Sequence, residues 1–201
     1  MATGNNDKFV RCWFEVDYDK IGFNRKNIED FHSTNFRYVP YIKSAGITKW
    51  WGNYYSVLKF DDTNYKLLSN SGNKLPSRQF YFKDNINWSL ISTDKFGARF
   101  ADFGGVFDVG AHAIYTNDKK LLKYIGGFLN TKIFNYFVKC MNPTLNYNSG
   151  AVQLIPYKKI ENEELLNAIN ELEKIFKEYW DFNEVSWGFK HFYIQMEERL
   201  I

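Results

Sequence analysis

The chain of 201 residues is poor in cysteine and histidine, and this shortage excludes two classes of protein. Its two cysteines, Cys12 and Cys140, are too few for the disulfide framework of a small secreted domain. The three histidines, His32, His112 and His191, do not stand with these cysteines at the spacing of a zinc site. We therefore expect no disulfide framework and no bound metal.

Long apolar runs are also missing. No stretch approaches the roughly 18 consecutive apolar residues that a membrane span requires. The first residues, MATGNNDKF, lack the apolar region of a secretory signal. There is no internal repeat and no linker rich in proline, glycine or serine. These absences predict a cytoplasmic protein that has no membrane partner.

Aromatic residues are abundant, at 19% of the chain, and 45% of all residues are apolar. This composition excludes a disordered chain and predicts a packed core. The net charge of +3 is unevenly spread, because residues 1–156 carry 20 Lys and Arg against 13 Asp and Glu, whereas residues 157–201 carry 6 against 10. The first part therefore favours a polyanionic partner, although a surplus of this size also occurs as ordinary solubility charge.

The first half of the chain has the pattern of irregular β structure. Aromatic and β-branched residues predict a short buried strand or an extended segment at 9–16. They predict strands at 36–42, 54–60, 78–82 and 105–109. The segment 61–77 is polar and rich in turn residues, so we expect a surface loop or an irregular connection there.

Helical spacing begins after Asn117, a plausible N-cap. One apolar face comprises Leu121, Leu122, Ile125, Phe128 and Leu129. Asn130 and Thr131 offer a stop and a new cap, and a second short helix follows. Residues 151–157, AVQLIPY, predict one more strand.

The clearest predicted element is a helix over 161–180. Its apolar stripe comprises Leu165, Leu166, Ile169, Leu172, Ile175, Phe176 and Tyr179. We expect this face to be buried, so that an aspartate at Leu172 would cost several kcal/mol. Glu173 and Lys177 are expected to form an i,i+4 ion pair on the solvated side.

Signals for catalysis are weak. The glycine pairs 104–105 and 126–127 lack the flanking spacing of a dinucleotide or phosphate loop. No serine occupies a nucleophile-elbow pattern, and the carboxylates fall mostly in turns or on helix faces. The tripeptide 142–144, Asn-Pro-Thr, lacks the second proline and the aromatic residue of the Asn-Pro-Pro-aromatic motif of amino-methyltransferases, which favours a turn. The segment alone is expected to catalyse nothing.

A basic middle region contains many aromatic residues. It comprises Lys43, Lys49, Trp50, Trp51, Tyr54, Tyr55, Arg78, Tyr81, Lys83, Trp88, Lys95 and Arg99. Cations of this kind position phosphates, while amides and planar side chains in loops contact bases. The same aromatic residues also suit core packing or a sugar-binding site. Adjacent side chains on a strand face opposite ways, so one of Trp50 and Trp51 is expected to be exposed.

The order of several motifs resembles a known family. The motifs are ATGNNDKFVRCWFEV (2–16), KWWGN (49–53), PSRQFYFKDNINWSLIS (76–92), KFGARF (95–100), GGVFDVGAHAI (104–114), GGFLNTKIFNYFVKCMNPTLNYNSGAVQLIPY (126–157) and DFNEVSWGF (181–189). Together they resemble the C-terminal specificity region of BREX-type, PglX-like adenine-specific DNA methyltransferases, and more broadly that of type IIG restriction–modification enzymes.

The resemblance implies a target-recognition segment whose catalytic core lies elsewhere in a longer parent chain. That parent would transfer a methyl group from S-adenosylmethionine to an adenine amino group, so no cofactor is expected in this segment. The implied partners are double-stranded DNA and the methyltransferase domain of the same parent. The residues expected to contact DNA are Lys43, Lys49, Trp51, Arg78, Lys83, Asn85, Ser92, Lys95 and Arg99.

The sequence thus predicts an α+β fold. A mixed β-sheet domain with short helices would span residues 1–157, and a helical segment would span 158–201 and pack on that domain or on the missing catalytic part. Three alternatives stay open: a carbohydrate- or protein-binding module, a small enzyme of unidentified kind, and, for the two arginines, internal ion pairs. In that last alternative Arg78 or Arg99 pairs with Asp84, Asp102 or Asp108.

Overall fold

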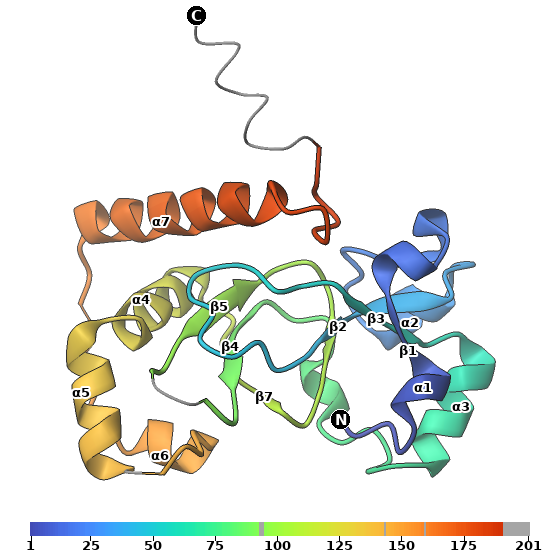
Figure 1. Cartoon of the computed structure of the whole chain (residues 1–201), viewed down its shortest axis with the longest axis horizontal. Coiled ribbons are helices and arrows are strands. Elements are labelled where there is room, and N and C mark those ends of the chain that lie inside the picture. The colour runs from blue at the N-terminus through green and yellow to red at the C-terminus, as the bar shows by residue number, and fades with distance from the viewer. Residues whose placement is uncertain (93–94, 143, 159, 191–201) are drawn as a thin grey trace, which may run out of the picture.

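The computed structural model describes residues 1–92, 95–142, 144–158 and 160–190. Two small β-sheets lie beside each other, each covered by its own helices, and one long helix crosses one side of the molecule (Figure 1). The predicted α+β class is confirmed. Pro143 of the tripeptide 142–144 and residues 191–201 of the predicted helical segment lie outside the described residues.

The first sheet has the strand order β1-β3-β2-β6, and only the pair β2 and β6 is parallel. Its strands are β1 (Val10–Cys12), β2 (Tyr38–Ile42), β3 (Ser56–Lys59) and β6 (Val106–Phe107). The helices α1 (Asn6–Phe9), α2 (Ile28–His32) and α3 (Asp62–Asn70) contribute Phe9, Phe31 and Leu68 to the core beside this sheet. Two 3-10 turns, Trp13–Glu15 and Tyr18–Lys20, follow β1, so the strand expected over 9–16 is shorter than predicted.

The second sheet has the antiparallel order β5-β4-β7, with β4 (Asn85–Ser89), β5 (Ala98–Ala101) and β7 (Ala111–Tyr115). It is packed against α4 (Lys119–Leu129) and, further out, α5 (Lys132–Met141), α6 (Ser149–Gln153) and α7 (Glu163–Asp181). A Cβ atom at Gly126 would lie 2.4 Å from the side chains of Ile86 and Phe100, and one at Gly127 would lie 2.5 Å from Ile169. The two glycines therefore permit the close packing of α4 between the sheet and α7.

The expectations for 61–77 and 78–82 are wrong. Residues 61–77 contain the helix α3, which begins because the Asp61 side chain accepts a hydrogen bond from the Asn64 N–H and buries Leu68 on its inner face. The expected strand 78–82 is a 3-10 turn at Arg78–Phe80. In the sequence of 61–77, only one capping side chain and one buried leucine indicate a helix. This signal is weaker than that of the many turn-forming residues around them.

The expected strand at 151–157 is also wrong, because this segment begins with the short helix α6. The Asn148 side chain accepts a hydrogen bond from the Ala151 N–H, and Val152 and Ile155 are buried three residues apart. The preceding helix α4 is capped by Asp118 rather than Asn117, and α5 is capped by Thr131 as expected.

Helix α7 is confirmed, but its apolar residues form two stripes rather than one. Leu166 and Ile169 are buried against α4, and Phe176 and Trp180 pack beside them. Leu172 is 37% exposed and Tyr179 is 75% exposed, so the expectation that the whole stripe is buried is wrong. The buried residues recur three and four positions apart and so share one face of α7. The exposed residues lie along the neighbouring face.

The predicted pair of Glu173 and Lys177 is not formed. Glu173 instead accepts from the Lys123 ammonium of α4, and its side chain is only 13% exposed. Burial raises the pKa of Glu173, and the hydrogen bond from Lys123 opposes this shift. Lys177 lies over the Trp51 ring at 4.5 Å. Tertiary partners on α4 and the 43–53 segment replace the local pair.

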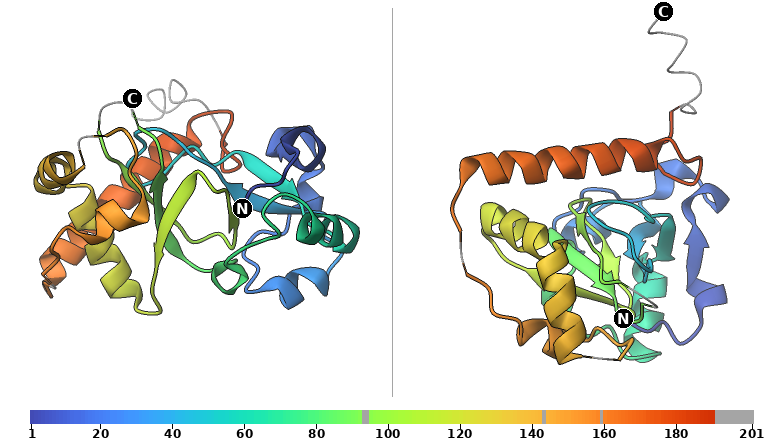
Figure 2. Two further views of the ribbon diagram at one scale, coloured as in Figure 1. Left: turned by 90° about the horizontal axis from the view of Figure 1, so that it is seen from below. Right: turned by 60° about the vertical axis from the view of Figure 1, so that its left-hand side comes forward.

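The polypeptide after α7 returns to the first sheet. The Trp13 Nε1–H donates to the Val185 carbonyl at 2.8 Å, and the Trp187 ring packs against Phe23, Tyr54 and Phe103. Helix α7 and this return segment therefore cover the same side of both sheets (Figure 2). Among the described residues, no helix has the length and apolar character needed to cross a membrane.

Candidate nucleic-acid interface

The segment 43–53 between β2 and β3 forms a loop whose two ends are held together by one buried arginine. The Arg99 guanidinium donates to the Lys43 carbonyl at the start of the loop and to the Gly52 carbonyl at its end, the latter at 2.6 Å. It also donates to the carbonyl of Asn53 at 3.0 Å and to Asn87 Oδ1 at 2.9 Å. Arg99 therefore fixes the shape of loop 43–53.

This arginine is itself enclosed. It is 2% exposed, and its guanidinium lies 4.1 Å from the centre of the Tyr54 ring. Burial lowers the pKa of Arg99, while the electrostatic effects of Tyr54 and Tyr55 raise it. Its polar partners in the described part of the chain are carbonyl and amide oxygens, so the internal ion pair with Asp84, Asp102 or Asp108 is not formed.

The rest of loop 43–53 is fixed by local hydrogen bonds. Thr48 Oγ1–H donates to the Ala45 carbonyl at 2.8 Å, and Asn53 Nδ2 donates to Thr48 Oγ1 at 2.6 Å. The Ala45 N–H donates to Ser89 Oγ of β4 at 2.8 Å. A Cβ atom at Gly97 would lie 2.8 Å from the Thr48 carbonyl, so glycine there lets the 95–98 segment lie directly against the loop.

The backbone of this loop takes left-handed conformations at several positions, and at Trp50 such a conformation is strained. Positive φ angles occur at Gly46 (60°), Trp50 (62°), Gly52 (131°) and Asn53 (54°). A tryptophan with positive φ is uncommon and persists only where surrounding contacts over-determine it. At the tip, Gly46 has open space around it and the neighbouring Ile47 is 41% exposed. The loop is therefore held against the second sheet and carries an exposed apolar side chain at its tip.

Lys49 and Lys95, two of the residues predicted to contact DNA, lie near each other beside this tip. Burial lowers the pKa of Lys49, and the nearby Lys95 ammonium lowers it further. The Lys49 ammonium donates to the Asn130 carbonyl at 3.0 Å, at the junction of α4 and α5. Lys43, at the start of the loop, is half-buried, and its ammonium lies 5.9 Å from the Tyr41 ring centre. Residues 43–53 include no acidic residue, so the loop surface is cationic.

Four other predicted contact residues lie inside the fold. Trp51, Asn85 and Ser92 are buried together with Arg99. Asn85 Oδ1 accepts from Asn87 Nδ2 at 3.0 Å, and Ser92 Oγ–H donates to the Lys95 carbonyl at 2.8 Å. None of the four side chains reaches the surface in this conformation, because each one is used to hold the loop or the second sheet.

Arg78 and Lys83 lie on a different part of the molecule from Lys49. The Arg78 guanidinium donates to the Leu75 carbonyl at 3.1 Å and to the Tyr65 hydroxyl at 3.1 Å, next to α3. Lys83 is exposed, with its ammonium 6.0 Å from the Phe80 ring centre. The structure thus divides the predicted 78–99 surface into two separate regions.

The aromatic rings that suggested a sugar site are mostly internal. Trp51, Tyr54, Tyr81 and Trp88 are each at most 5% exposed, and Trp50 is half-buried against the core. The expectation that one ring of the tryptophan pair is exposed is therefore wrong. Buried rings cannot stack on a pyranose face.

Groups suited to catalysis are sparse in the described part of the chain. No group of three or more His, Cys, Asp or Glu residues could hold a metal ion there. His112 Nδ1 lies 2.6 Å from Ser149 Oγ and accepts from the Ser149 N–H at 3.2 Å. Burial lowers the pKa of His112. This imidazole anchors the first turn of α6, which is a structural use of the ring.

Comparison with known proteins relates the chain to methyltransferases. No protein-family model matches it. It is 29% identical over 198 residues to the adenine-specific methyltransferase PglX of Lacticaseibacillus casei (strain Zhang), covering 94% of this chain and 16% of that protein. It is also 29% identical over 190 residues to the adenine-specific methyltransferase BrxX of Escherichia coli O9:H4 (strain HS), covering 94% and 15%.

The chain therefore spans less than a fifth of the length of the curated relatives that it matches. The match extends over nearly the whole of this chain. These matches agree with the resemblance that the motif series indicated, and they relate the chain to one segment of BREX-type adenine-specific methyltransferases.

Proposed function

We propose that this chain is the target-recognition segment of an adenine-specific DNA methyltransferase, and that it binds duplex DNA in a sequence-dependent way. The observation that carries this proposal is the similarity over 94% of the chain to two adenine-specific methyltransferases. The fixed cationic loop 43–53 supports it, because a recognition element must keep its shape while its cations meet phosphates.

In this proposal the tip of loop 43–53 enters a groove of the duplex. Lys43 and Lys49, with Lys95 beside them, would contact backbone phosphates, and Ile47 at the tip would lie against base edges such as a thymine methyl group. Arg78 and Lys83 would contact phosphates on a second part of the surface. Trp51, Asn85, Ser92 and Arg99 would act through the shape of the loop and the second sheet rather than by touching DNA.

The remainder of the longer parent protein would supply the chemistry. It would bind S-adenosylmethionine and receive an adenine turned out of the duplex, while this segment keeps the duplex in register. Such an enzyme would act in the cytoplasm, in BREX phage defence or restriction–modification, where methylation marks the cell's own DNA.

The exposed stripe of α7 would bind the catalytic part of the same parent. Leu165, Leu172, Ile175 and Tyr179 recur at heptad-like spacing and are between 37% and 75% exposed. Three glutamates, Glu164, Glu171 and Glu178, are also exposed and recur every seven residues beside this stripe. We therefore propose as occupant a helix of the catalytic part that presents an apolar stripe flanked by lysine or arginine. A second copy of α7 would place glutamates against glutamates.

Salt-dependent binding to a duplex tests the proposal. The purified chain is titrated against a fluorescent duplex of about 20 base pairs, and about four phosphate contacts would lower the affinity roughly 100-fold between about 50 and 200 mM salt. Binding to soluble oligosaccharides, measured in parallel, is expected to be absent. Oligosaccharide binding without duplex binding would contradict the proposal and favour the carbohydrate-binding alternative.

A further inference from the structure

A second group of cations lies on the first sheet, away from loop 43–53. In the strand register, Arg11 of β1 pairs with Val57 of β3, and Tyr38 of β2 pairs with Lys59 of β3. Because side chains alternate along a strand, Arg11 and Lys59 point to the same face in a diagonal relation. Arg37 directly precedes Tyr38, and Lys8 lies in α1 just before β1.

Four cations, named here the β1–β3 cluster (Lys8, Arg11, Arg37 and Lys59), lie close enough for the other three to act on Lys59. Burial lowers the pKa of Lys59, and the positive charges of Arg11, Arg37 and Lys8 lower it further, against the opposing effect of Asp61. Like charges placed together on a sheet destabilise the fold. A group of like positive charges on one surface attracts a negatively charged ligand.

The cluster is poorly neutralised by the protein itself. Arg37 Nε lies 3.7 Å from Asp61 Oδ2, whereas Lys8, Arg11 and Lys59 form no ion pair with any described carboxylate. The Arg11 guanidinium donates to the carbonyls of Asp7 and Val10, which carry no charge.

The acidic side chains that follow β1 have other roles. Glu15 accepts from the Cys12 N–H at 2.6 Å, and Asp17 accepts from the Asp19 N–H at 3.2 Å. They stabilise the two 3-10 turns after the strand.

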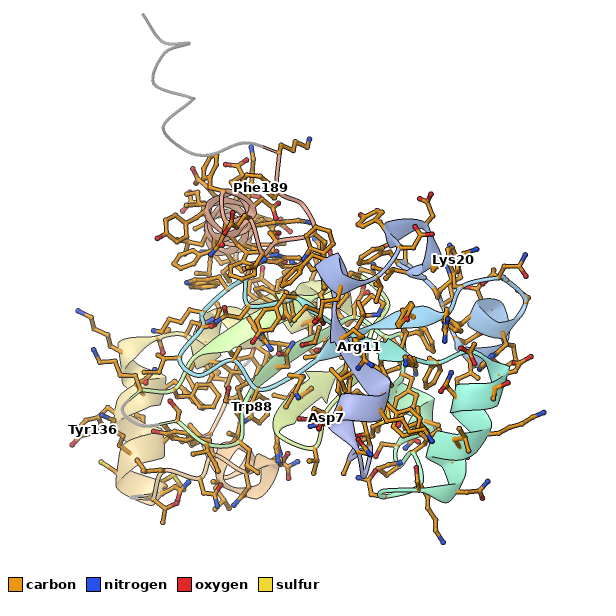
Figure 3. The ribbon with its side chains drawn as sticks, turned by 45° about the vertical axis from the view of Figure 1, so that its right-hand side comes forward. Asp7, Arg11, Lys20, Trp88, Tyr136 and Phe189 are labelled. Carbon is orange, nitrogen blue, oxygen red and sulfur yellow. The ribbon has the colours of Figure 1, made fainter. Side chains whose placement is uncertain are left out.

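We propose that the β1–β3 cluster binds backbone phosphates of the same duplex that loop 43–53 contacts. This inference rests on the proposed function and adds a second, separate contact surface. In Figure 1 the loop between β2 and β3 and the strand β1 both lie on the side of the molecule that faces the viewer. Figure 3, in which the right-hand side comes forward, shows Arg11 on β1. One duplex could therefore cross both regions.

Charge-removing variants test the assignment on the whole chain. The double variant Arg11→Gln/Lys59→Gln is compared with Lys66→Gln/Lys174→Gln, which removes two exposed lysines on α3 and α7. The cluster variant is expected to flatten the slope of log affinity against log salt by about 2 and to weaken binding about 10- to 100-fold at low salt. The control variant should bind within about twofold of the parent chain, and Arg11→Lys, which keeps the charge, should retain the parental slope.

A second experiment measures the pKa of Lys59 directly, after reductive methylation of the lysines with a carbon-13 label. The pKa of Lys59 should rise in Arg11→Gln, because a like charge is removed, and should rise again in the parent chain when duplex is added. If duplex binds with an unchanged slope in the cluster variant and leaves the Lys59 pKa unchanged, this inference is wrong while the proposed function stands. If the parent chain binds no duplex at low salt, both are contradicted.

Discussion

The buried Arg99 offers the sharpest test of how loop 43–53 is held. In Arg99→Lys the positive charge remains, but the planar fork of donors that reaches Lys43, Gly52 and Asn53 is replaced by one ammonium. A single ammonium cannot reach carbonyls at both ends of the loop and Asn87 Oδ1 together. The substitution therefore leaves buried acceptors without donors.

The expected cost can be set from these contacts. Hydrogen bonds that involve a charged group contribute about 1.5–3 kcal/mol each, and a buried acceptor left unpaired costs about 1–3 kcal/mol. Because such terms are not additive within one network, we expect Arg99→Lys to lower the free energy of unfolding by about 3 kcal/mol. Arg99→Met should cost at least as much, because it removes every donor and leaves the same buried acceptors unpaired.

Urea unfolding followed by tryptophan fluorescence measures these changes. The matched control is Arg78→Lys, because Arg78 also donates to a carbonyl but is exposed. The control should change the free energy of unfolding by less than about 1 kcal/mol. If Arg99→Lys unfolds like the parent chain, the guanidinium does not hold the loop and the reasoning is refuted.

Three further predictions concern α7, the loop lysines and the cofactor. Ile169→Asp should cost several kcal/mol, whereas Leu172→Asp should cost less than about 1 kcal/mol, since only Ile169 is enclosed; equal thermal shifts would contradict the two-stripe description of α7. Lys95→Ala should raise the pKa of Lys49, because a like charge is removed, and an unchanged Lys49 titration by NMR would show that the two ammonium groups are far apart in solution. Calorimetry should detect no binding of S-adenosylmethionine to this chain, and micromolar binding would place the cofactor site within it.

Elements with a clear pattern of apolar residues were predictable from the sequence. Helix α7 begins at an asparagine cap and continues through Asp181, close to the expected 161–180. The strands β2 and β3 lie inside the expected 36–42 and 54–60. Their aromatic and β-branched residues suffice because they are buried on both faces of the sheet.

Which apolar face is buried was not predictable. Leu166 and Leu172 are the same residue type in one helix, yet α4 covers the first, while the second is 37% exposed. The glycines of α4 that admit Ile169 carry no sequence signal beyond a weak helix. The partner of Glu173 was missed for the same reason, because Lys123 lies 50 residues away in the chain.

The candidate interface was predictable as a region but not residue by residue. Lys43, Lys49 and Lys95 were selected by charge, and the strand pairing brings their segments together, as with the bridge between Trp50 and Arg99. Arg99 carries the same charge in the sequence, yet it is enclosed by backbone carbonyls. The β1–β3 cluster was missed because its members come from three separate stretches of the chain, at residues 8–11, 37 and 59, that the sheet brings together.

An exchange of segments tests most directly whether this chain recognises the target sequence. The full-length parent methyltransferase and a chimera in which this segment is replaced by that of a relative with another target are expressed in cells, and adenine methylation is sequenced across the genome. The methylated motif should follow the segment that each enzyme carries, because the catalytic part contributes the transfer of the methyl group and not the choice of site. An active chimera that still methylates the parental motif would contradict the account.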